Sequence, residues 1–274
     1  YDAIESPILK IARRVTASDY KPFYMYRMTT DGLLEQIGAD GEMKSMHLLE
    51  DEYQSRVYPW GRKLAITEVM FRNDDLGAFG DLARLFGVTT KRTISKQGFS
   101  VLLSQRDTFW TTGKGNRLAA GAGSALSLTS LGDAYQLFLQ AEDASGEPID
   151  IEPKYLLVAP RDKVLAVNLH TQQQLNLNAP GEFAGNSFVG QFAPLHSPHL
   201  ANGKVPNANG TQWMLCADPA VTSPIVAAFL DGREGPRIKT WESLPGRLGM
   251  QWDIDCSFGF NLHDPKAAVF SPGQ

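Results

Sequence analysis

The clearest helical pattern in the chain covers residues 73–105, where apolar residues recur every three or four positions. The first apolar face comprises Leu76, Phe79, Leu82, Ala83, Leu85 and Phe86. An Asx-type cap at residues 73–75 begins this helix, and Gly87 predicts its end. A second helix is predicted over residues 89–105, about 25 Å long, although Gly98 inside it weakens the helical preference.

The second half of the chain mixes short apolar runs with helical patterns. Continuous apolar runs at residues 155–159, 213–217 and 225–230 are too short for buried helices and predict buried strands. Residues 251–260 and 267–270 predict two more strands, which flank a turn at residues 262–265. In the first of them Trp252, Ile254, Cys256, Phe258 and Phe260 alternate with polar or small residues, so one face is apolar and the other wet. Helices are predicted over residues 128–139, with Ser130 or Asp133 near the start, and from residue 161 to residue 169. The mixture predicts an α+β fold.

Two segments are less regular. Residues 106–123 predict a hairpin followed by a flexible link, because turn residues precede a stretch of Ala and Gly. Residues 172–210 contain Asn, Gln, Gly and Pro throughout, with one strand expected at residues 188–192.

The N-terminal region is rich in aromatic residues that lack a local core. A short amphipathic piece at residues 4–15 precedes residues 19–26, which hold four aromatic side chains around Pro22 and are expected to be extended after it. Two interpretations stay open: a strand on the protein's own core, or an arm that reaches over a neighbouring subunit.

Residues 38–66 are polar and of mixed charge, and they predict a two-stranded excursion. Tyr53, Val57, Leu64 and Ile66 alternate partially, and Pro59–Gly61 forms a breaker between the two strands. An isolated hairpin is marginal in water, so another surface must support it. That surface belongs either to a neighbouring copy or to the same domain.

Composition excludes several classes of protein. The chain has 274 residues, of which 43% are hydrophobic and 20% charged, so it can bury a sizeable core. With a formal net charge of −4, the chain lacks the excess of positive charge that nonspecific DNA binding requires. No apolar run reaches the roughly 18 residues of a membrane span, and no leader pattern appears.

The two cysteines, Cys216 and Cys256, lie in apolar contexts and are expected to be buried free thiols. A disulfide between them stays an alternative, and the reducing cytosol is the default compartment.

Candidate chemistry is weak, and we expect neither a catalytic site, nor a cofactor, nor a metal. His196 and His199 lie close in sequence but no Cys or nearby carboxylate completes a metal set. Residues 112–115 lack the glycine spacing and the Lys-Ser/Thr ending of a phosphate loop. Cys256 and His263 are the closest nucleophile and base, but strand alternation places Cys256 on an apolar face. The acidic residues fit other roles: Asp74 and Asp75 a helix cap, and Glu50, Asp51 and Glu52 a solvated loop.

Residues 66–79, 152–160 and 213–219 together resemble the major head subunits of tailed bacteriophages. The resemblance is specifically to the group akin to the phage Mu head subunit and to capsid proteins fused to a prohead protease. The resemblance runs in order from about Tyr20 to about Phe270, and its motifs are loose. It implies the Hong Kong 97-type capsid fold and a structural protein rather than an enzyme.

The resemblance implies a division of the chain into four parts. These are an N-terminal arm (1–36), an extended loop (37–66), a peripheral domain with a long spine helix (67–126 and 246–274) and an axial domain (127–245). The expected contacts between subunits lie in the first two parts. They are Tyr20, Phe23, Tyr24, Tyr26, Lys44, Tyr53, Arg56, Trp60 and Arg62.

The implied function is assembly of hexamers and pentamers into an icosahedral head that encloses double-stranded DNA. The implied partners are other copies of the chain, a portal, decoration proteins, a prohead protease or scaffold, and the packaged DNA through weak inner-surface contact. The protein is then expected in the virion after assembly in the host bacterial cytoplasm, without a membrane partner. Removal of a segment before Tyr1 during head maturation, or simple trimming of the chain, would each explain the missing Met.

Two other functions stay open: an encapsulin-like or gene-transfer-agent shell, and an α+β hydrolase. Some members of the fold also crosslink subunits between a Lys of the extended loop and an Asn. Lys44, Lys63 and Asn261 are the positions here that correspond.

Overall fold

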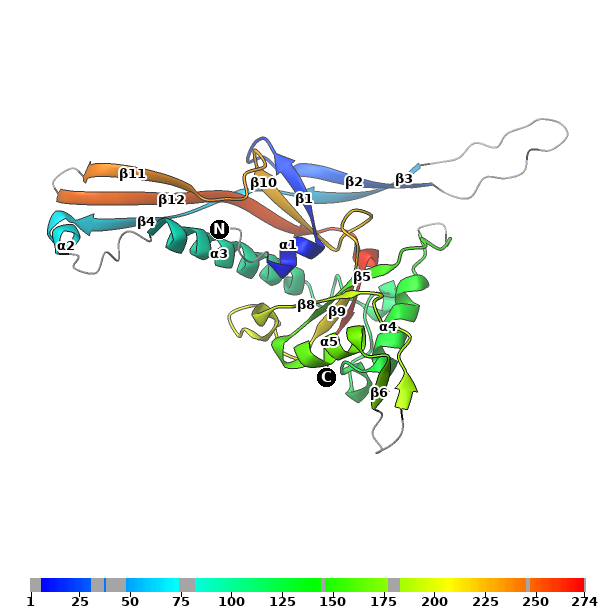
Figure 1. Cartoon of the computed structure of the whole chain (residues 1–274). Coiled ribbons are helices and arrows are strands. Elements are labelled where there is room, and N and C mark those ends of the chain that lie inside the picture. Colours follow the sequence, from blue (N-terminus) through cyan, green and yellow to red (C-terminus); the bar gives the residue numbers. More distant parts are fainter. Residues whose placement is uncertain are drawn as a thin grey trace.

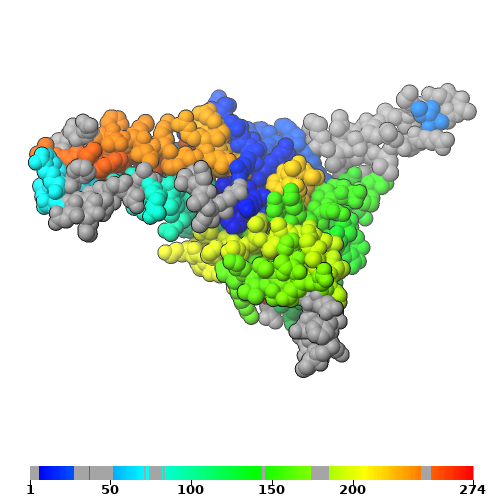
Figure 2. All heavy atoms as spheres, in the orientation of Figure 1, coloured from blue at the N-terminus to red at the C-terminus, as the bar shows by residue number. Residues whose placement is uncertain are grey.

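The computed structural model describes residues 6–30, 37, 48–73, 82–143, 146–176, 183–244 and 247–273. The chain forms a long upper layer of strands and a roughly triangular lower lobe (Figure 1, Figure 2). One end of the upper layer carries the β11–β12 hairpin, and a two-stranded ribbon projects from the opposite end (Figure 1). Helices and strands together confirm the predicted α+β class.

The upper layer is a five-stranded sheet built around one long strand, β12 (Arg247–Leu262). One edge of β12 pairs antiparallel with β4 (Tyr58–Thr67). On its other edge, the first part of β12 pairs with β11 (Arg237–Leu244) and the last part with β10 (Ile225–Leu230). The sheet ends in β1 (Ala12–Ala17), which runs parallel to β10. The sequence patterns did not predict β11.

A single helix, α3 (Leu82–Ser104), lies along the upper sheet and packs against β12 (Figure 1). Its 23 residues span about 35 Å. The predicted break at Gly87 is therefore wrong, because the helical pattern continues through this residue and one long helix replaces the expected pair. The proposed cap at residues 73–75 lies mostly outside the described residues, and a short helix α2 (Glu68–Arg72) precedes it.

The lower lobe contains a four-stranded sheet in the order β13 (Ala268–Ser271), β9 (Trp213–Ala217), β5 (Pro153–Val158) and β8 (Ala193–His196). Alternate residues of its strands enter two different cores. Met214 and Phe270 join the core shared with α3 and the upper sheet, whereas Leu215 and Val269 join the core beneath α4 (Leu128–Leu139) and α5 (Lys163–Thr171). Burial on both faces explains why these strands are apolar at successive positions.

The predicted hairpin within residues 38–66 is wrong in its pairing. β3 (Leu48–Ser55) pairs with β2 (Phe23–Thr30) to form the projecting ribbon, whereas β4 pairs with β12. The expected breaker Pro59–Gly61 lies inside β4, where the missing N–H of proline is tolerated because β4 pairs on one edge with β12. Residues 56 and 57 separate β3 from β4 and belong to neither strand.

Three further expectations differ from the structure. Residues 188–192 form a turn rather than a strand, because Phe188 and Phe192 point into the lower core. Residues 106–123 contain turns and short 3-10 helices rather than a hairpin, and their one described bridge joins Arg117 to Phe270. The N-terminal piece forms α1 (Pro7–Ile11) and β1 on the protein's own core, with Ile8 and Ile11 fully buried.

The remaining described elements are small. They are the strands β6 (Gln174–Asn176) and β7 (Phe183–Gly185) and the 3-10 helices Thr112–Lys114, Ala122–Ser124, Pro160–Asp162, Pro198–Ala201 and Pro265–Ala267.

Strand pairing crosses the boundaries that the resemblance implies. β4 falls within the expected extended loop, and β10 and β11 within the expected axial domain, yet all three belong to the upper sheet. Conversely, β13 falls within the expected peripheral domain and pairs with β9 in the lower lobe. The chain thus passes repeatedly between the two sheets, because each sheet needs strands from distant parts of the sequence.

Candidate functional site

The ribbon has an outward face and a face turned toward the body. Tyr24 and Tyr26 share the outward face with their cross-strand partners Gln54 and Glu52. Half of each tyrosine surface is exposed, 49% for Tyr24 and 52% for Tyr26, and both partners are exposed as well. The outward face therefore combines two aromatic rings with a carboxylate, a composition suited to contact with another molecule.

The other face holds the ribbon to the body. Phe23 packs against Ala17, Val57 and Ala228 at the root of the ribbon. Further out, the Tyr53 ring meets the His263 ring edge to face, with centroids 4.7 Å apart. Phe23 and Tyr53, both expected as contacts between subunits, are thus partly satisfied within their own chain.

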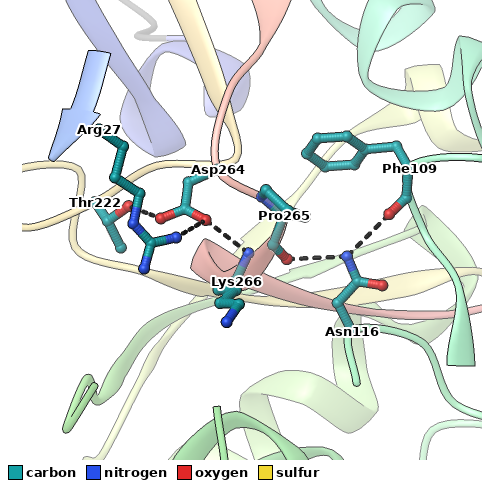
Figure 3. Close-up of polar contacts among 7 residues, drawn as sticks. All are labelled: Arg27, Phe109, Asn116, Thr222, Asp264, Pro265 and Lys266. Atoms are coloured by element: carbon teal, nitrogen blue, oxygen red, sulfur yellow. Dashed lines mark hydrogen bonds and ion pairs between the residues drawn. The ribbon is translucent and has the colours of Figure 1, made fainter. Parts of the chain in front are cut away.

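An ion pair joins the ribbon to the turn between the two sheets (Figure 3). Arg27 Nη1 lies 3.0 Å from Asp264 Oδ1, and their side chains are only 17% and 5% exposed. Asp264 Oδ1 also accepts a hydrogen bond from the Lys266 amide at 2.9 Å, and Asp264 Oδ2 accepts one from Thr222 Oγ1 at 3.0 Å. The carboxylate is therefore fully engaged by three donors from three segments.

Asn116 fixes the other side of the same turn (Figure 3). Its buried side-chain amide donates to the carbonyls of Phe109, at 3.0 Å, and Pro265, at 2.9 Å, while its Oδ1 accepts from the Thr111 amide at 2.8 Å. The sequence analysis missed Arg27, Asn116 and Asp264. The Asp-Pro pair did indicate a turn, but the sequence shows no link between that turn and residues 27 or 116.

A corner of exposed side chains lies where the ribbon joins the upper sheet. Arg56 Nε donates to the Tyr20 carbonyl at 3.0 Å, and its guanidinium lies 5.4 Å from the centre of the Tyr58 ring. The Tyr20 hydroxyl lies 3.0 Å from Ser257 Oγ. Of the expected contact residues, Tyr20 and Arg56 thus lie together at this corner.

A groove of about 440 Å³ lies between α3 and the upper sheet. Its lining residues are Trp60, Gly61, Arg62, Phe86, Thr89, Thr90, Thr93, Ile254, Cys256 and Phe258. Trp60 stacks on Phe258 with centroids 5.5 Å apart, and its Nε1 donates to the Phe258 carbonyl at 3.3 Å. The groove thus has an aromatic and aliphatic lining, and the exposed Arg62 contributes a positive charge.

The histidine and cysteine side chains that were considered for chemistry pack within the fold and do not form a reactive group. Burial lowers the pKa of His196 and of His199, with smaller contributions from Lys163 and Lys96 respectively. Among the described residues, no group of three or more metal-ligating side chains comes together. His263 contacts Tyr53, whereas Cys256 Sγ lies 3.9 Å from the Glu234 carbonyl.

Both cysteines are buried free thiols, as predicted. Burial raises the pKa of Cys216 to about 12 and that of Cys256 to about 11, so both are protonated at neutral pH.

Some expected residues lie outside the described part of the chain, among them Lys44, Asp74 and Asp75; the side chains of Glu50 and Asp51 are likewise not described. Of the other two crosslink candidates, Lys63 is exposed on β4. The Asn261 amide donates to the Gln54 carbonyl at 2.7 Å and so ties β12 to the ribbon. No described helix is both long enough and apolar enough to cross a membrane.

Comparison with known proteins gives one family and a set of similar folds. A family model for phage capsid proteins matches residues 51–270. A structure from Mycobacterium phage Adephagia is 12% identical with a TM-score of 0.62, covering 97% of this chain and 89% of that chain. The capsid structure of the Cyanophage P-SCSP1u is 14% identical with a TM-score of 0.63, covering 97% and 87% respectively. At these identities the similarity shows a shared fold. No curated protein matches the sequence of this chain.

Proposed function

The chain belongs to the phage capsid protein family, and we propose that its copies join as hexamers and pentamers through the ribbon. Its α+β fold is of the Hong Kong 97 type, and it is a major capsid protein that forms the shell of the phage head. The family match over residues 51–270 is the observation that carries this function. The geometry supports the surfaces that we assign to the contacts.

Two complementary surfaces lie at separate places on the molecule. The outward face of the ribbon presents Tyr24, Tyr26 and Glu52, whereas the groove beside α3 presents Trp60 and Arg62. The ribbon projects away from the end of the upper layer that carries α3 and the β11–β12 hairpin (Figure 1), so it does not reach the groove of its own chain. Contact between two different surfaces is heterologous and closes into a ring when the rotation between copies permits.

Charge supports the same pairing. The Glu52 carboxylate on the ribbon is exposed, and so is the Arg62 guanidinium at the groove. Opposite charges at the edge of an aromatic contact steer the encounter and fix its register. We therefore assign the ribbon of one copy to the groove of the next, with Tyr20, Phe23, Tyr53 and Arg56 positioning the ribbon and Lys44 extending the contact.

A charge exchange tests this assignment. The wild-type chain is expected to form rings or shells in sedimentation velocity and negative-stain microscopy. Glu52→Arg and Arg62→Glu should each raise the concentration needed for assembly by about tenfold or more, and the double variant should recover most of the loss. Arg161→Glu, an exposed change in the lower lobe, serves as the control.

The outcomes separate the parts of the proposal. A wild-type chain that stays monomeric at high concentration would contradict assembly of the chain on its own. Assembly that ignores both single substitutions would contradict the assigned surfaces.

Membership of a phage capsid family supports a proposal of further partners. We propose a portal, decoration proteins, and a prohead protease or scaffold as protein partners, with assembly in the host bacterial cytoplasm. The net charge of −4 supports a weak inner-surface contact with packaged DNA. The division into arm, extended loop, peripheral and axial domains, and the absence of catalysis, belong to the same proposal.

A further inference from the structure

We propose that Arg27 and Asp264 form a latch that fixes the direction in which the ribbon leaves the body. We propose further that this direction sets how copies of the chain close into a shell, a step that rests on the proposed function. The latch consists of the Arg27–Asp264 ion pair and the donors that hold Asp264 in place, the Thr222 hydroxyl and the Lys266 amide (Figure 3).

The ribbon is anchored at its root and projects from there away from the body. β2 and β3 form a two-stranded sheet of their own, and Phe23 anchors the root in a small cluster. Arg27 lies four residues further along β2, about 13 Å from Phe23 at about 3.3 Å per residue. A contact at that distance from the root resists rotation far better than a contact at the root itself. Arg27 is therefore placed to control the angle of the ribbon.

Asp264, the partner of Arg27, is held rigidly because it lies at the junction of the two sheets. Besides its side-chain bonds, Asp264 donates its backbone amide to the Ser223 carbonyl at 3.3 Å, just before β10. The following residue, Pro265, is held through its carbonyl by Asn116. The Arg27–Asp264 pair thus fixes the angle of the ribbon relative to both the upper sheet and the lower lobe.

Loss of Arg27 should loosen the part of the ribbon beyond the Tyr53–His263 and Asn261–Gln54 contacts, which lie nearer the root, and spare the body. Without Arg27, the Asp264 carboxylate keeps two of its three donors, the Thr222 hydroxyl and the Lys266 amide, so the turn should keep its shape. Since the pair is largely shielded from water, salt should screen it little in the native chain. The predicted signature is a wider range of ribbon angles in a chain that still unfolds in one cooperative transition. Its melting temperature should fall, because the buried Asp264 carboxylate loses its counter-charge.

Spin labels measure the angle directly. The labels are placed at Tyr26→Cys on the ribbon and Lys163→Cys on α5, both exposed, while the buried Cys216 and Cys256 stay unlabelled. Pulsed electron resonance on unassembled chain should give one narrow distance distribution. Arg27→Met should at least double its width, and Arg27→Lys, which keeps the charge, should leave it narrow. Lys154→Met, which removes an exposed ion pair with Asp218 in the lower lobe, should also leave it narrow.

Assembly tests the second half of the proposal. Arg27→Met without labels should form particles whose diameters in negative stain spread at least twice as widely as those of the wild type. A narrow distance distribution in Arg27→Met would overturn the latch. A broad distribution with wild-type particles would overturn its role in closure.

Two provisions keep these tests decisive. If Arg27→Met lacks a thermal transition, Arg27→Gln replaces it, because Gln retains a donor and lacks the charge. If the wild type does not assemble at all, the proposed function fails, and the label distances still decide whether the latch exists.

Discussion

At the residue scale, buried polar side chains do more to define this structure than any candidate for catalysis. Asn116 and Asp264 are almost fully buried, and each makes three hydrogen bonds or ion pairs, of which at least one reaches a segment far away in sequence. A buried polar group that loses its partner costs free energy, so such residues specify one arrangement of the chain. They do so here at the junction of the two sheets.

Replacing Asn116 with Ala should lower the free energy of unfolding by about 3 kcal/mol, because buried groups of Phe109, Thr111 and Pro265 would lose their partner. Urea denaturation followed by tryptophan fluorescence measures the loss. Asn202→Ala removes a comparable hydrogen bond at an exposed site and should cost less than about 1 kcal/mol. Equal losses for the two variants would contradict the role assigned to Asn116.

His263 should make the protein less stable in mild acid. Burial lowers its pKa, against a smaller opposite effect of Asp264, with Arg13 and Arg27 adding to the decrease. The unfolded chain therefore binds a proton more readily, and stability falls as pH drops below the ordinary histidine pKa of about 6.5. The slope contributed is at most about 1.4 kcal/mol per pH unit.

Unfolding free energies measured between pH 8 and pH 5 test this expectation. His263→Asn should give a shallower dependence than the wild type but not a flat one, because His196 and His199 shift in the same direction. An unchanged slope would contradict the assignment to His263.

At the scale of elements, α3 depends on a glycine for its packing. A Cβ at Gly98 would lie 2.7 Å from Ile8 Cγ1 and 3.2 Å from Phe260 Cε1. The missing side chain lets α1 and β12 approach the helix closely, so a residue that weakens the isolated helix is required by its neighbours.

Gly98→Ala should therefore destabilise the protein by about 1–3 kcal/mol despite the better helical propensity of alanine. Gly132 in α4 has no atom within 4 Å of its ideal Cβ position, so Gly132→Ala should stabilise by about 0.5–1 kcal/mol. Thermal unfolding of both variants measures the difference. The same sign for the two substitutions would refute this explanation of Gly98.

Elements with a strong local pattern could be predicted from sequence, and their partners could not. The buried runs at β9 and β10 match the structure residue for residue, and a helix was correctly expected at α4. The predictions that failed concerned features that depend on contacts between residues far apart in sequence. β4 contains Pro59 and Gly61, yet β12 offers ten paired positions along it. The Arg27–Asp264 pair spans 237 residues of sequence, and nothing local to either residue indicates it.

At the scale of the whole molecule, the four-stranded sheet couples the two cores. In β13, Val269 packs beneath α4 while its neighbour Phe270 packs against the core around α3, where it stacks on Trp110. One short strand thus contributes to both cores, so displacement of β13 would disrupt both cores at once.

Phe270→Ala should cost about 3–5 kcal/mol and Val269→Ala about 2–3 kcal/mol, since each leaves a cavity in a different core. Both variants should nevertheless unfold in one transition that coincides by fluorescence and circular dichroism. Two separate transitions would show that the upper layer and the lower lobe unfold independently.

The interleaving of strands between the two sheets also bears on synthesis at the ribosome. β13 is the last strand that the structure describes, and both hydrophobic cores include its residues. A nascent chain that has not emerged through residue 271 therefore has two incomplete cores and exposes the apolar residues that β13 would cover. Growing copies on one polysome would be prone to aggregate until that strand is made, so the last residues of synthesis decide when a copy becomes safe for assembly.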